Sequence, residues 1–597
     1  MSVNSSILKV ARVIAKPIVN NLPLMVVWVI ALALGAVCDL PKLWQLEYPT
    51  LTYVLGLLRI MTCSVALSVV VAYLLAAVAR WAPLRWLLAF IALLIIGVYV
   101  FLRLNYSSRL TPEISVFISE TNRGEATEYL NTYLFSSHAL PVLIGVVVAM
   151  VCWVLVDRWW QRRRHSTSKR VDIGLSAVMA LALIGAACAP VTWTLALSLL
   201  RGDKAQYNDS FGLDAITNVM FCQHQLRQYD ELTARFIEVT NAACDTAISV
   251  PTDAPTVVLV IGESYIKTHA SIYGYKLPTT PCMTQELAAG RLYAFTDAIS
   301  PFNNTNMTMR TMLSLNSVAA GEEWQDMPLF PALFKKAGYR VDMWDNQREF
   351  FRESAYTRGL NGFIYHHEVI RLCYSEVNTN NFDYDGPFVD DYAAHAEKFG
   401  DSVPSLVIIH LRGQHIRAEK RYPHNAGFDR FSPSDYAYRT EAFLTDAMRQ
   451  EIAYYDNATL YNDYVMGKIF EIFGKRDAVV VYFSDHGDEI YDYRPSIGRR
   501  TDGDNQSLML HYQHDVPFVV WCSPTFQNRH LEKIQHIAAA VSRPIMLDNV
   551  GQMLLGLAGI DAACYHPDRD ALNTAYVPHP RIVNFSILYD NTSSLSN

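Results

Sequence analysis

The stretch Ala478-Val479-Val480-Val481-Tyr482-Phe483-Ser484-Asp485-His486-Gly487 decides the fold of this chain. Its first six residues are apolar or aromatic and rich in valine, which is typical of a strand buried on both faces of a parallel sheet. Asp485 and His486 follow the strand, so an oxygen and a nitrogen ligand stand at its carboxyl end, where α/β sheets bind their ligands. An isolated Asp-His dipeptide at the end of a strand more often has a structural role. A second motif in this chain, however, favours a metal site.

That second motif is the run Thr256-Val257-Val258-Leu259-Val260-Ile261, which leads into Gly262-Glu263-Ser264. It is another buried-strand pattern with a carboxylate at its end. Two such strand ends in one chain indicate a shared divalent-metal site more strongly than either does alone. Oxygen and nitrogen ligands are compatible with zinc, although they are less diagnostic than thiolates.

Strand-like and helical runs alternate after Thr256. The strand-like runs are Val257 to Ile261, Arg340 to Trp344, Ser405 to Ile409, Ala478 to Phe483 and Val516 to Trp521. The helical runs are Pro328 to Ala337, Met448 to Phe473 and Met546 to Ala558. This alternation predicts a mainly parallel sheet between helices, an α/β domain over residues 256–597.

The apolar residues of the chain are concentrated before residue 200. At 597 residues and 51% hydrophobic content, the chain is too long for one domain and too apolar to be uniformly soluble. Five apolar runs are each close to the roughly 20 residues that cross a bilayer as a helix. They are Leu22 to Leu40, Leu57 to Ala79, Leu84 to Leu102, Leu140 to Val156 and Ile173 to Leu199. We therefore predict an N-terminal all-α transmembrane bundle of five helices over residues 1–200.

Basic residues flank these runs unevenly. They are Lys9, Arg12 and Lys16 before the first run, Arg80 and Arg85 between the second and third, and Arg158, Arg162, Arg163, Arg164, Lys169 and Arg170 between the fourth and fifth. Such an excess of positive charge places these segments in the cytoplasm. An odd number of spans then puts the chain after Leu200 in the periplasm of a Gram-negative-type cell, as part of an inner-membrane protein. A four-span chain would instead put it among cytosolic nucleotides.

Two connecting segments have patterns of their own. Residues 103–138 show helical spacing of apolar side chains, which predicts amphipathic helices at the outer membrane interface, as a lid on the bundle or as a lipid-binding element. Residues 201–255 predict a helical linker, with Leu226 to Val239 periodic. The formal net charge of -7 gives no indication of nucleic-acid binding. The six cysteines outside the spans permit disulfides: Cys222, Cys244, Cys282, Cys373, Cys522 and Cys564.

Further motifs surround the two strand ends. They are Ser271-Ile272-Tyr273-Gly274-Tyr275, Thr279-Thr280-Pro281, Tyr455-Asp456-Asn457 and Tyr461-Asn462-Asp463-Tyr464. With the five spans and the strand-end motifs, they make essentially the whole chain resemble the phosphoethanolamine transferases of the sulfatase-like, alkaline phosphatase superfamily. The resemblance implies a metal-dependent enzyme with one firmly bound zinc, and leaves open a second zinc during turnover.

The resemblance also implies a nucleophile. In that family a threonine follows the first glutamate, attacks the donor phosphate and is itself a zinc ligand. The matching stretch here is Asn304-Thr305-Asn306-Met307-Thr308-Met309-Arg310-Thr311-Met312-Leu313-Ser314, and its spacing favours Thr305 over Thr308 and Thr311. A hydroxyl becomes a good nucleophile when a cation lowers its pKa. The implied metal ligands are Glu263, Thr305, Asp485 and His486.

Five more residues are candidates for contact with substrate. His415, in His410-Leu411-Arg412-Gly413-Gln414-His415, matches a family histidine that would protonate the departing diacylglycerol oxygen or help bind a second metal. Lys267 and His269 come just after Glu263 and are candidates to meet the donor phosphate. His511 and His514 precede the last strand-like run, and the choice between them stays open.

The chain departs from the branch of the family that modifies lipid A. That branch flanks its nucleophile with a disulfide, whereas Pro301 and Thr311 stand at the corresponding places here. In addition, no Cys-Lys-Gly follows Trp344-Asp345-Asn346-Gln347. The resemblance therefore implies phosphatidylethanolamine and membrane lipids as partners, with an acceptor among envelope glycans, lipopolysaccharide core sugars and lipid A, and favours the sugars.

Two other functions compete with this one. A phosphoglycerol transferase of the lipoteichoic-acid-synthase or periplasmic-glucan type would share the spans, the threonine and the superfamily. An inactive, membrane-anchored lipid-binding scaffold would share only the fold. The presence of Glu263, Thr305, Asp485 and His486 together argues against the scaffold.

Overall fold

The structure of the chain is a computed structural model, and it describes residues 2–45, 57–58, 60–106, 139–163, 168–200, 231–246, 248–347, 360–398, 403–415, 417–499 and 506–591. It divides into two compact units, Met1–Gln225 and Leu226–Asn597. Most of the predicted amphipathic segment, residues 107–138, lies outside the described residues, as do residues 201–230 of the predicted linker. Residues 231–244, at the end of that linker, are helical.

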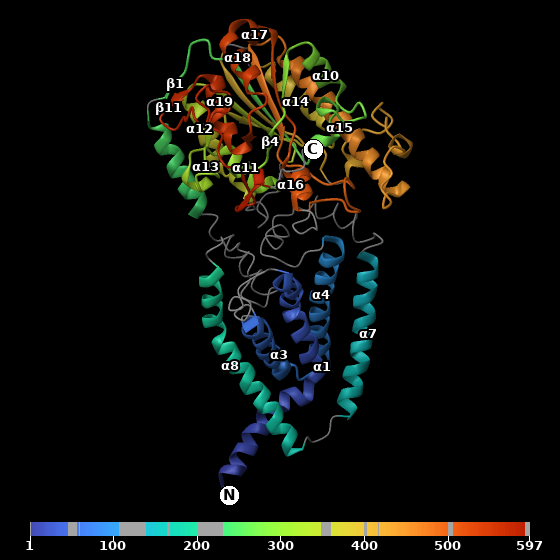
Figure 1. The fold of residues 1–597 in the computed structure, drawn as a ribbon. Helices are drawn as coiled ribbons and strands as arrows, with labels where there is room; N and C mark the ends of the chain where they lie inside the picture. Colours follow the sequence, from blue (N-terminus) through green and yellow to red (C-terminus); the bar gives the residue numbers. More distant parts are fainter. Residues whose placement is uncertain are drawn as a thin grey trace. The chain divides into compact units, whose positions relative to one another are not determined.

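The first unit consists of long apolar helices, which confirms the predicted five spans (Figure 1). They are α1 (Ser2–Gln45), α3 (Leu67–Val78), which continues a π-helical turn η1 (Ile60–Ala66), α4 (Ala82–Tyr106), α7 (Ala139–Arg163) and α8 (Lys169–Leu200). The first stretch of membrane length, Ser6–Leu34, begins well before the predicted Leu22. The prediction began at Leu22 because the charged residues Lys9, Arg12 and Lys16 interrupt the apolar sequence before it. In the structure, helix α1 includes these three residues.

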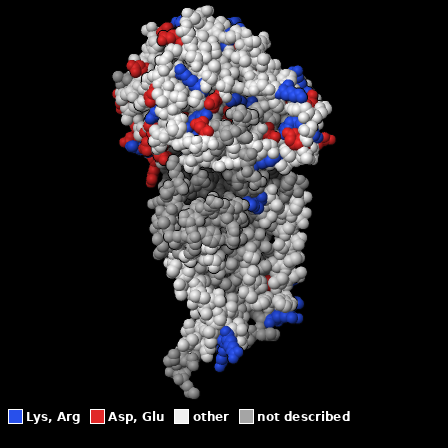
Figure 2. Space-filling model, in the orientation of Figure 1, with Lys and Arg blue, Asp and Glu red and all other residues white. Residues whose placement is uncertain are grey.

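Charges in the described part of this unit are few. Figure 2 shows a face of the long helices that is almost free of charged side chains along its length, with Lys and Arg near its ends. Inside the unit, Arg85 of α4 pairs with Asp157 of α7 at 3.1 Å, and Trp86 donates a hydrogen bond to the same carboxylate. Burying a charge in an apolar bundle requires such a partner, so this pair fixes α4 against α7.

The second unit contains a seven-stranded sheet with the order β3-β9-β8-β2-β7-β5-β6. Its strands are β2 (Thr256–Gly262), β3 (Leu292–Phe295), β5 (Arg340–Asp345), β6 (Glu376–Val377), β7 (Ser405–His410), β8 (Ala478–Ser484) and β9 (Phe518–Cys522). All neighbours pair in parallel except β9, which is antiparallel to both β8 and β3. The predicted mainly parallel sheet is confirmed.

Helices cover both faces of this sheet (Figure 1). Alternate residues of β2 enter two separate cores: Val257, Leu259 and Ile261 one of them, Val258 and Val260 the other. The first core is completed by α11 (Thr305–Leu313), α12 (Phe330–Lys336), α13 (His367–Cys373), α18 (Leu531–Ala540) and α19 (Val550–Ala558). The second is completed by α10 (Pro281–Ala288), α14 (Asp385–Ala396) and α15 (Asp446–Phe473). Burial on both faces explains the unbroken apolar runs of β2 and β8.

Two details differ from the sequence-based expectations. The last strand begins at Phe518 rather than Val516, after α16 (Gln506–His514). The predicted helix Met546 to Ala558 is α-helical only from Val550, because Ile545 and Met546 form strand β10, which pairs with β4 (Ala298–Ile299), and Leu547–Asn549 form a 3-10 turn. The cysteines whose side chains the structure describes are free thiols, including Cys244, Cys282, Cys373, Cys522 and Cys564.

Candidate active site

The two strand-end motifs meet at one edge of the sheet. Strands β2 and β8 are parallel neighbours, and their register pairs Gly262 with Ser484. Glu263 and Asp485 therefore leave the sheet side by side. Together with His486 they are buried, and each offers a ligand atom that lies within 4.8 Å of the other two.

The backbone around Glu263 is tightly constrained. Ser264 adopts a φ of 55°, a left-handed conformation that costs a residue with a side chain about 1–3 kcal/mol. Its amide donates to Asp485 Oδ1 at 3.2 Å, and its hydroxyl donates to Glu263 Oε1 at 2.7 Å. On the other side, Gly413 has a φ of 50°, and a Cβ there would lie 2.7 Å from the Glu263 carbonyl oxygen. The loop after β7 thus packs directly on the end of β2.

Thr305 approaches the ligands from the N-terminus of α11, where Asn304 caps the helix by accepting from the Met307 amide. Its Oγ1 lies 3.1 Å from Glu263 Oε2 and 3.4 Å from His486 Nε2. Thr308 is buried and instead lies 3.1 Å from the hydroxyl of Ser300. The geometry brings Thr305, and not Thr308, to these three side chains.

The electrostatics of the three residues favour a cation. Burial raises the pKa of Asp485, and the nearby charge of Glu263 raises it further. Although burial opposes it, interactions with His486, His415 and Arg499 lower the pKa of Glu263. Two buried carboxyl groups at this spacing repel each other when both are ionised, and a divalent ion relieves that repulsion.

The hydrogen bonds leave suitable lone pairs for such an ion. His486 Nδ1 lies 2.7 Å from the Gly487 carbonyl oxygen, which fixes the proton on Nδ1 and leaves the lone pair of Nε2 toward Thr305 and the carboxylates. Asp485 Oδ2 is buried and accepts no hydrogen bond from the described residues. A buried oxygen that accepts no hydrogen bond costs free energy unless a metal ion or a water molecule binds it. These residues therefore fit a zinc ion.

His415 follows Gln414, whose amide donates a hydrogen bond to the Glu263 carbonyl oxygen at 3.0 Å. His415 is half-buried in the loop after β7. Burial has the largest effect on the pKa values of Glu263 and His486, and the charge of His415 is among the smaller effects that lower both. The loop that carries His415 therefore packs on the end of β2, and its role toward substrate or metal stays a prediction.

His269 lies elsewhere. Its Nδ1 is 2.6 Å from Asp456 Oδ1 and its Nε2 is 2.9 Å from Asp492 Oδ1. Burial lowers the pKa of His269, but the two carboxylates outweigh burial and raise it to about 10. Both ring nitrogens are engaged by carboxylates, which leaves none for a donor phosphate.

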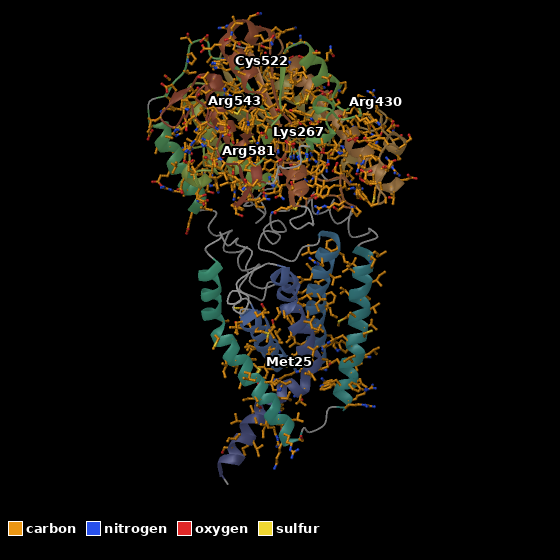
Figure 3. All side chains as sticks on the ribbon, viewed as in Figure 1. Met25, Lys267, Arg430, Cys522, Arg543 and Arg581 are labelled. Carbon is orange, nitrogen blue, oxygen red and sulfur yellow. The ribbon has the colours of Figure 1, made fainter. Side chains whose placement is uncertain are left out.

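Lys267, His511 and His514 also have structural partners. Lys267, labelled in Figure 3, donates to Asp515 Oδ1 at 2.8 Å, and His511 Nδ1 lies 3.6 Å from the other oxygen of that carboxylate. His514 is buried, and its Nδ1 lies 2.8 Å from the Ser300 carbonyl oxygen. Burial lowers the pKa of His514 to about 4, so its ring is neutral at pH 7.

Sequence reasoning missed three residues at the site. Gln347 follows β5 and donates to Glu263 Oε2 at 3.2 Å and to the Leu411 carbonyl at 2.8 Å. His410 ends β7, and its Nδ1 lies 2.9 Å from Asp345 Oδ1. Gln347 and His410 could have been predicted from the sequence, because each lies at or just after the end of a strand. Arg499 contacts His486 from a loop, with no local pattern that marks it.

Comparison with known proteins places this geometry in a family. The family model described as Sulfatase matches residues 255–560. The phosphoethanolamine transferase EptC of Escherichia coli (strain K12) is 26% identical over 521 residues, which cover 81% of this chain and 82% of that protein. The phosphoethanolamine transferase CptA of Salmonella typhimurium is 25% identical over 518 residues, with the same coverage.

One solved structure extends the likeness to both units. The integral membrane protein lipooligosaccharide phosphoethanolamine transferase A from Neisseria meningitidis aligns with a TM-score of 0.61 and 17% identity, covering 94% of this chain and 99% of that chain. The predicted fold, a bundle of five apolar helices followed by a sulfatase-like α/β domain, is confirmed, as is the resemblance to phosphoethanolamine transferases. Because the family model covers just over half of the chain, the protein belongs to the sulfatase family.

Proposed function

We propose that this protein is a phosphoethanolamine transferase of a bacterial inner membrane, with its catalytic domain in the periplasm. The observation that carries the proposal is the hydroxyl of Thr305, 3.1 Å from Glu263 in a buried set of three metal-ligating side chains. Relatives named phosphoethanolamine transferases that align with four fifths of the chain support the same reaction rather than a phosphoglycerol transfer or a scaffold role.

In the first step, Thr305 Oγ1 attacks the phosphorus of phosphatidylethanolamine. The Oγ1–P bond forms, and the bond between phosphorus and the diacylglycerol oxygen breaks. The proton lost by Thr305 is balanced by a proton gained by that departing oxygen, for which His415 is the proposed donor. The products are diacylglycerol and a phosphoethanolamine-threonine. An acceptor hydroxyl or phosphate then takes the phosphoethanolamine group, and Thr305 regains a proton.

Glu263, Asp485, His486 and the Thr305 oxygen are the proposed ligands of a zinc ion. Bound there, zinc supplies positive charge that lowers the pKa of the hydroxyl and stabilises negative charge on the phosphoryl oxygens. Gln347 keeps Glu263 oriented through its hydrogen bond to Oε2. A second zinc during turnover, with His415 as a candidate ligand, remains part of the proposal.

The proposed acceptor is an envelope glycan or lipopolysaccharide, with core sugars favoured over lipid A. Support comes from Pro301 and Thr311, which stand where the lipid A-modifying branch has a disulfide flanking the nucleophile. Mass spectrometry of glycans and lipopolysaccharide from cells with and without the protein identifies the acceptor.

Zinc-loaded protein given phosphatidylethanolamine without acceptor is expected to release diacylglycerol and to gain a phosphoethanolamine group on Thr305. Covalent intermediates of this kind accumulate when the second substrate is withheld. Intact-mass measurement and peptide mapping check the result. An added mass of phosphoglycerol would favour the rival enzyme, and the absence of both adduct and diacylglycerol would favour the scaffold.

A reporter that is active only outside the cytoplasm is expected to be active when fused after Asn597 and inactive when fused near His165. Five apolar helices support this orientation, as do the basic residues at the end of α7 and the start of α8, among them Arg162 and Lys169. Measurement of reporter activity in intact cells checks it. The reverse pattern would separate the catalytic domain from a periplasmic acceptor and contradict the proposed localisation.

A further inference from the structure

Arg499 brings a guanidinium group to the nucleophile. Its Nη1 donates to the Asn303 carbonyl oxygen at 2.9 Å, lies 3.0 Å from His486 Nδ1 and also contacts Nε2 of that ring. Thr305 Oγ1 is 3.4 Å from the same Nε2. The guanidinium and the hydroxyl therefore converge on one nitrogen of His486.

The protonation of His486 limits what that contact can be. Its Nδ1 proton is given to the Gly487 carbonyl, so only Nε2 can accept a hydrogen bond from Arg499. The same lone pair is the one proposed to bind zinc, and one lone pair cannot serve both. The hydrogen bond to Asn303 does not depend on His486, so it can hold the guanidinium two residues before Thr305 whether or not His486 binds a metal.

Arg499 and its neighbour Arg494 differ in whether a carboxylate pairs with the guanidinium group. Arg494, in the same loop, is neutralised by two hydrogen bonds to Glu489, at 2.6 and 2.5 Å. Within the described ranges of the chain, Arg499 makes no ion pair with a carboxylate. It is half-buried, so an anion that enters from solvent can reach it.

We propose that Arg499 binds the phosphoryl group during transfer, through a non-bridging oxygen of the donor phosphate and then of the phosphothreonine. This inference rests on the proposed function. A guanidinium carries five N–H donors in a planar fork that matches phosphate oxygens. Anchored at Asn303, it holds the phosphorus near Thr305 Oγ1 while the bond to Thr305 forms and the bond to the diacylglycerol oxygen breaks. Arg499 itself neither gives nor takes a proton.

The test compares zinc-loaded, full-length wild type with Arg499→Gln and Arg499→Lys. Titration calorimetry with inorganic phosphate is expected to show affinity lower by about 10-fold to 100-fold in Arg499→Gln, as for a lost charge-assisted hydrogen bond. The rate of adduct formation from phosphatidylethanolamine is expected to fall similarly, and Arg499→Lys to recover part of both. Zinc content should be unchanged. Arg529→Gln is the matched control, because its side chain is 51% exposed and pairs with Asp477 on the surface.

Wild-type phosphate affinity and adduct rate in Arg499→Gln would overturn the inference. Loss of zinc from that variant would overturn it too, because Arg499 would then support His486 rather than bind phosphate. If wild type forms no adduct while Arg499→Gln still loses phosphate affinity, the proposed transferase function fails and the assignment of Arg499 stands.

Discussion

Replacing Thr305 with alanine is expected to abolish both the phosphoethanolamine adduct and the release of diacylglycerol, with a loss of at least about 1,000-fold, as for removal of other nucleophiles. The reason is positional. Thr305 Oγ1 lies 3.1 Å from Glu263 Oε2, whereas the hydroxyl of Thr308 bonds to Ser300 and the Phe302 carbonyl. Release of diacylglycerol from vesicles that contain phosphatidylethanolamine measures the effect.

Two matched variants make that test decisive. Thr305→Ser keeps a hydroxyl at the same place and should keep part of the activity, while Thr308→Ala should still form the adduct on Thr305. An adduct mapped to Thr308 or Thr311 would refute the choice of nucleophile but not the family. An adduct that forms in Thr305→Ala would refute the mechanism at this residue.

Replacing Asp485 with asparagine is expected to weaken zinc binding by more than about 100-fold, the upper end for loss of a residue that only supports a ligand. A neutral amide replaces an anionic oxygen that is buried and accepts no hydrogen bond from the described residues. Activity should fall with zinc content. Competition with a chromogenic chelator measures the affinity, and Asp446→Asn, with a side chain 93% exposed, controls for the loss of one charge.

The loss of zinc from Asp485→Asn should not result from unfolding of the variant. Burial and the charge of Glu263 raise the pKa of Asp485, which disfavours its ionised form relative to its neutral form when no cation is bound. Asparagine has nearly the shape of that neutral form, and the metal-free variant should unfold at or above the wild-type temperature. Full zinc occupancy in Asp485→Asn would show that Asp485 is not a ligand.

The sequence predicted the strands that are buried on both faces, because burial on both faces favours runs of apolar residues. Strands β2, β5, β7 and β8 were predicted to within a residue or two of their ends. Strand β3, only Leu292–Phe295, was missed, since four residues with half-buried positions give little signal. Helix α14 was missed because its apolar residues are separated by Asp390 and Asp391.

The candidate site divides in the same way. Glu263, Asp485 and His486 are visible in the sequence because each ends or follows a strand. Lys267 and His269 are close to Glu263 along the chain, yet the structure pairs them with Asp515 and with Asp456 and Asp492. Distance along a chain does not predict contact once the backbone turns, as it does at Ser264. Arg499 reaches His486 through tertiary packing alone, which no local pattern records.

The central place of β2 has a consequence for the order in which the protein is made. Val257 pairs with Leu406 on one side and with Val479 on the other, so β2 is synthesised long before either neighbour. Pairings so distant in sequence fold slowly, and an apolar strand that waits for its partners is prone to aggregation. A ribosome that stalls before Ala478 would leave β2 half-paired and the ligand set incomplete. The side chains proposed to hold zinc therefore come together only after Asp485 and His486 have been synthesised, late in the growth of the chain.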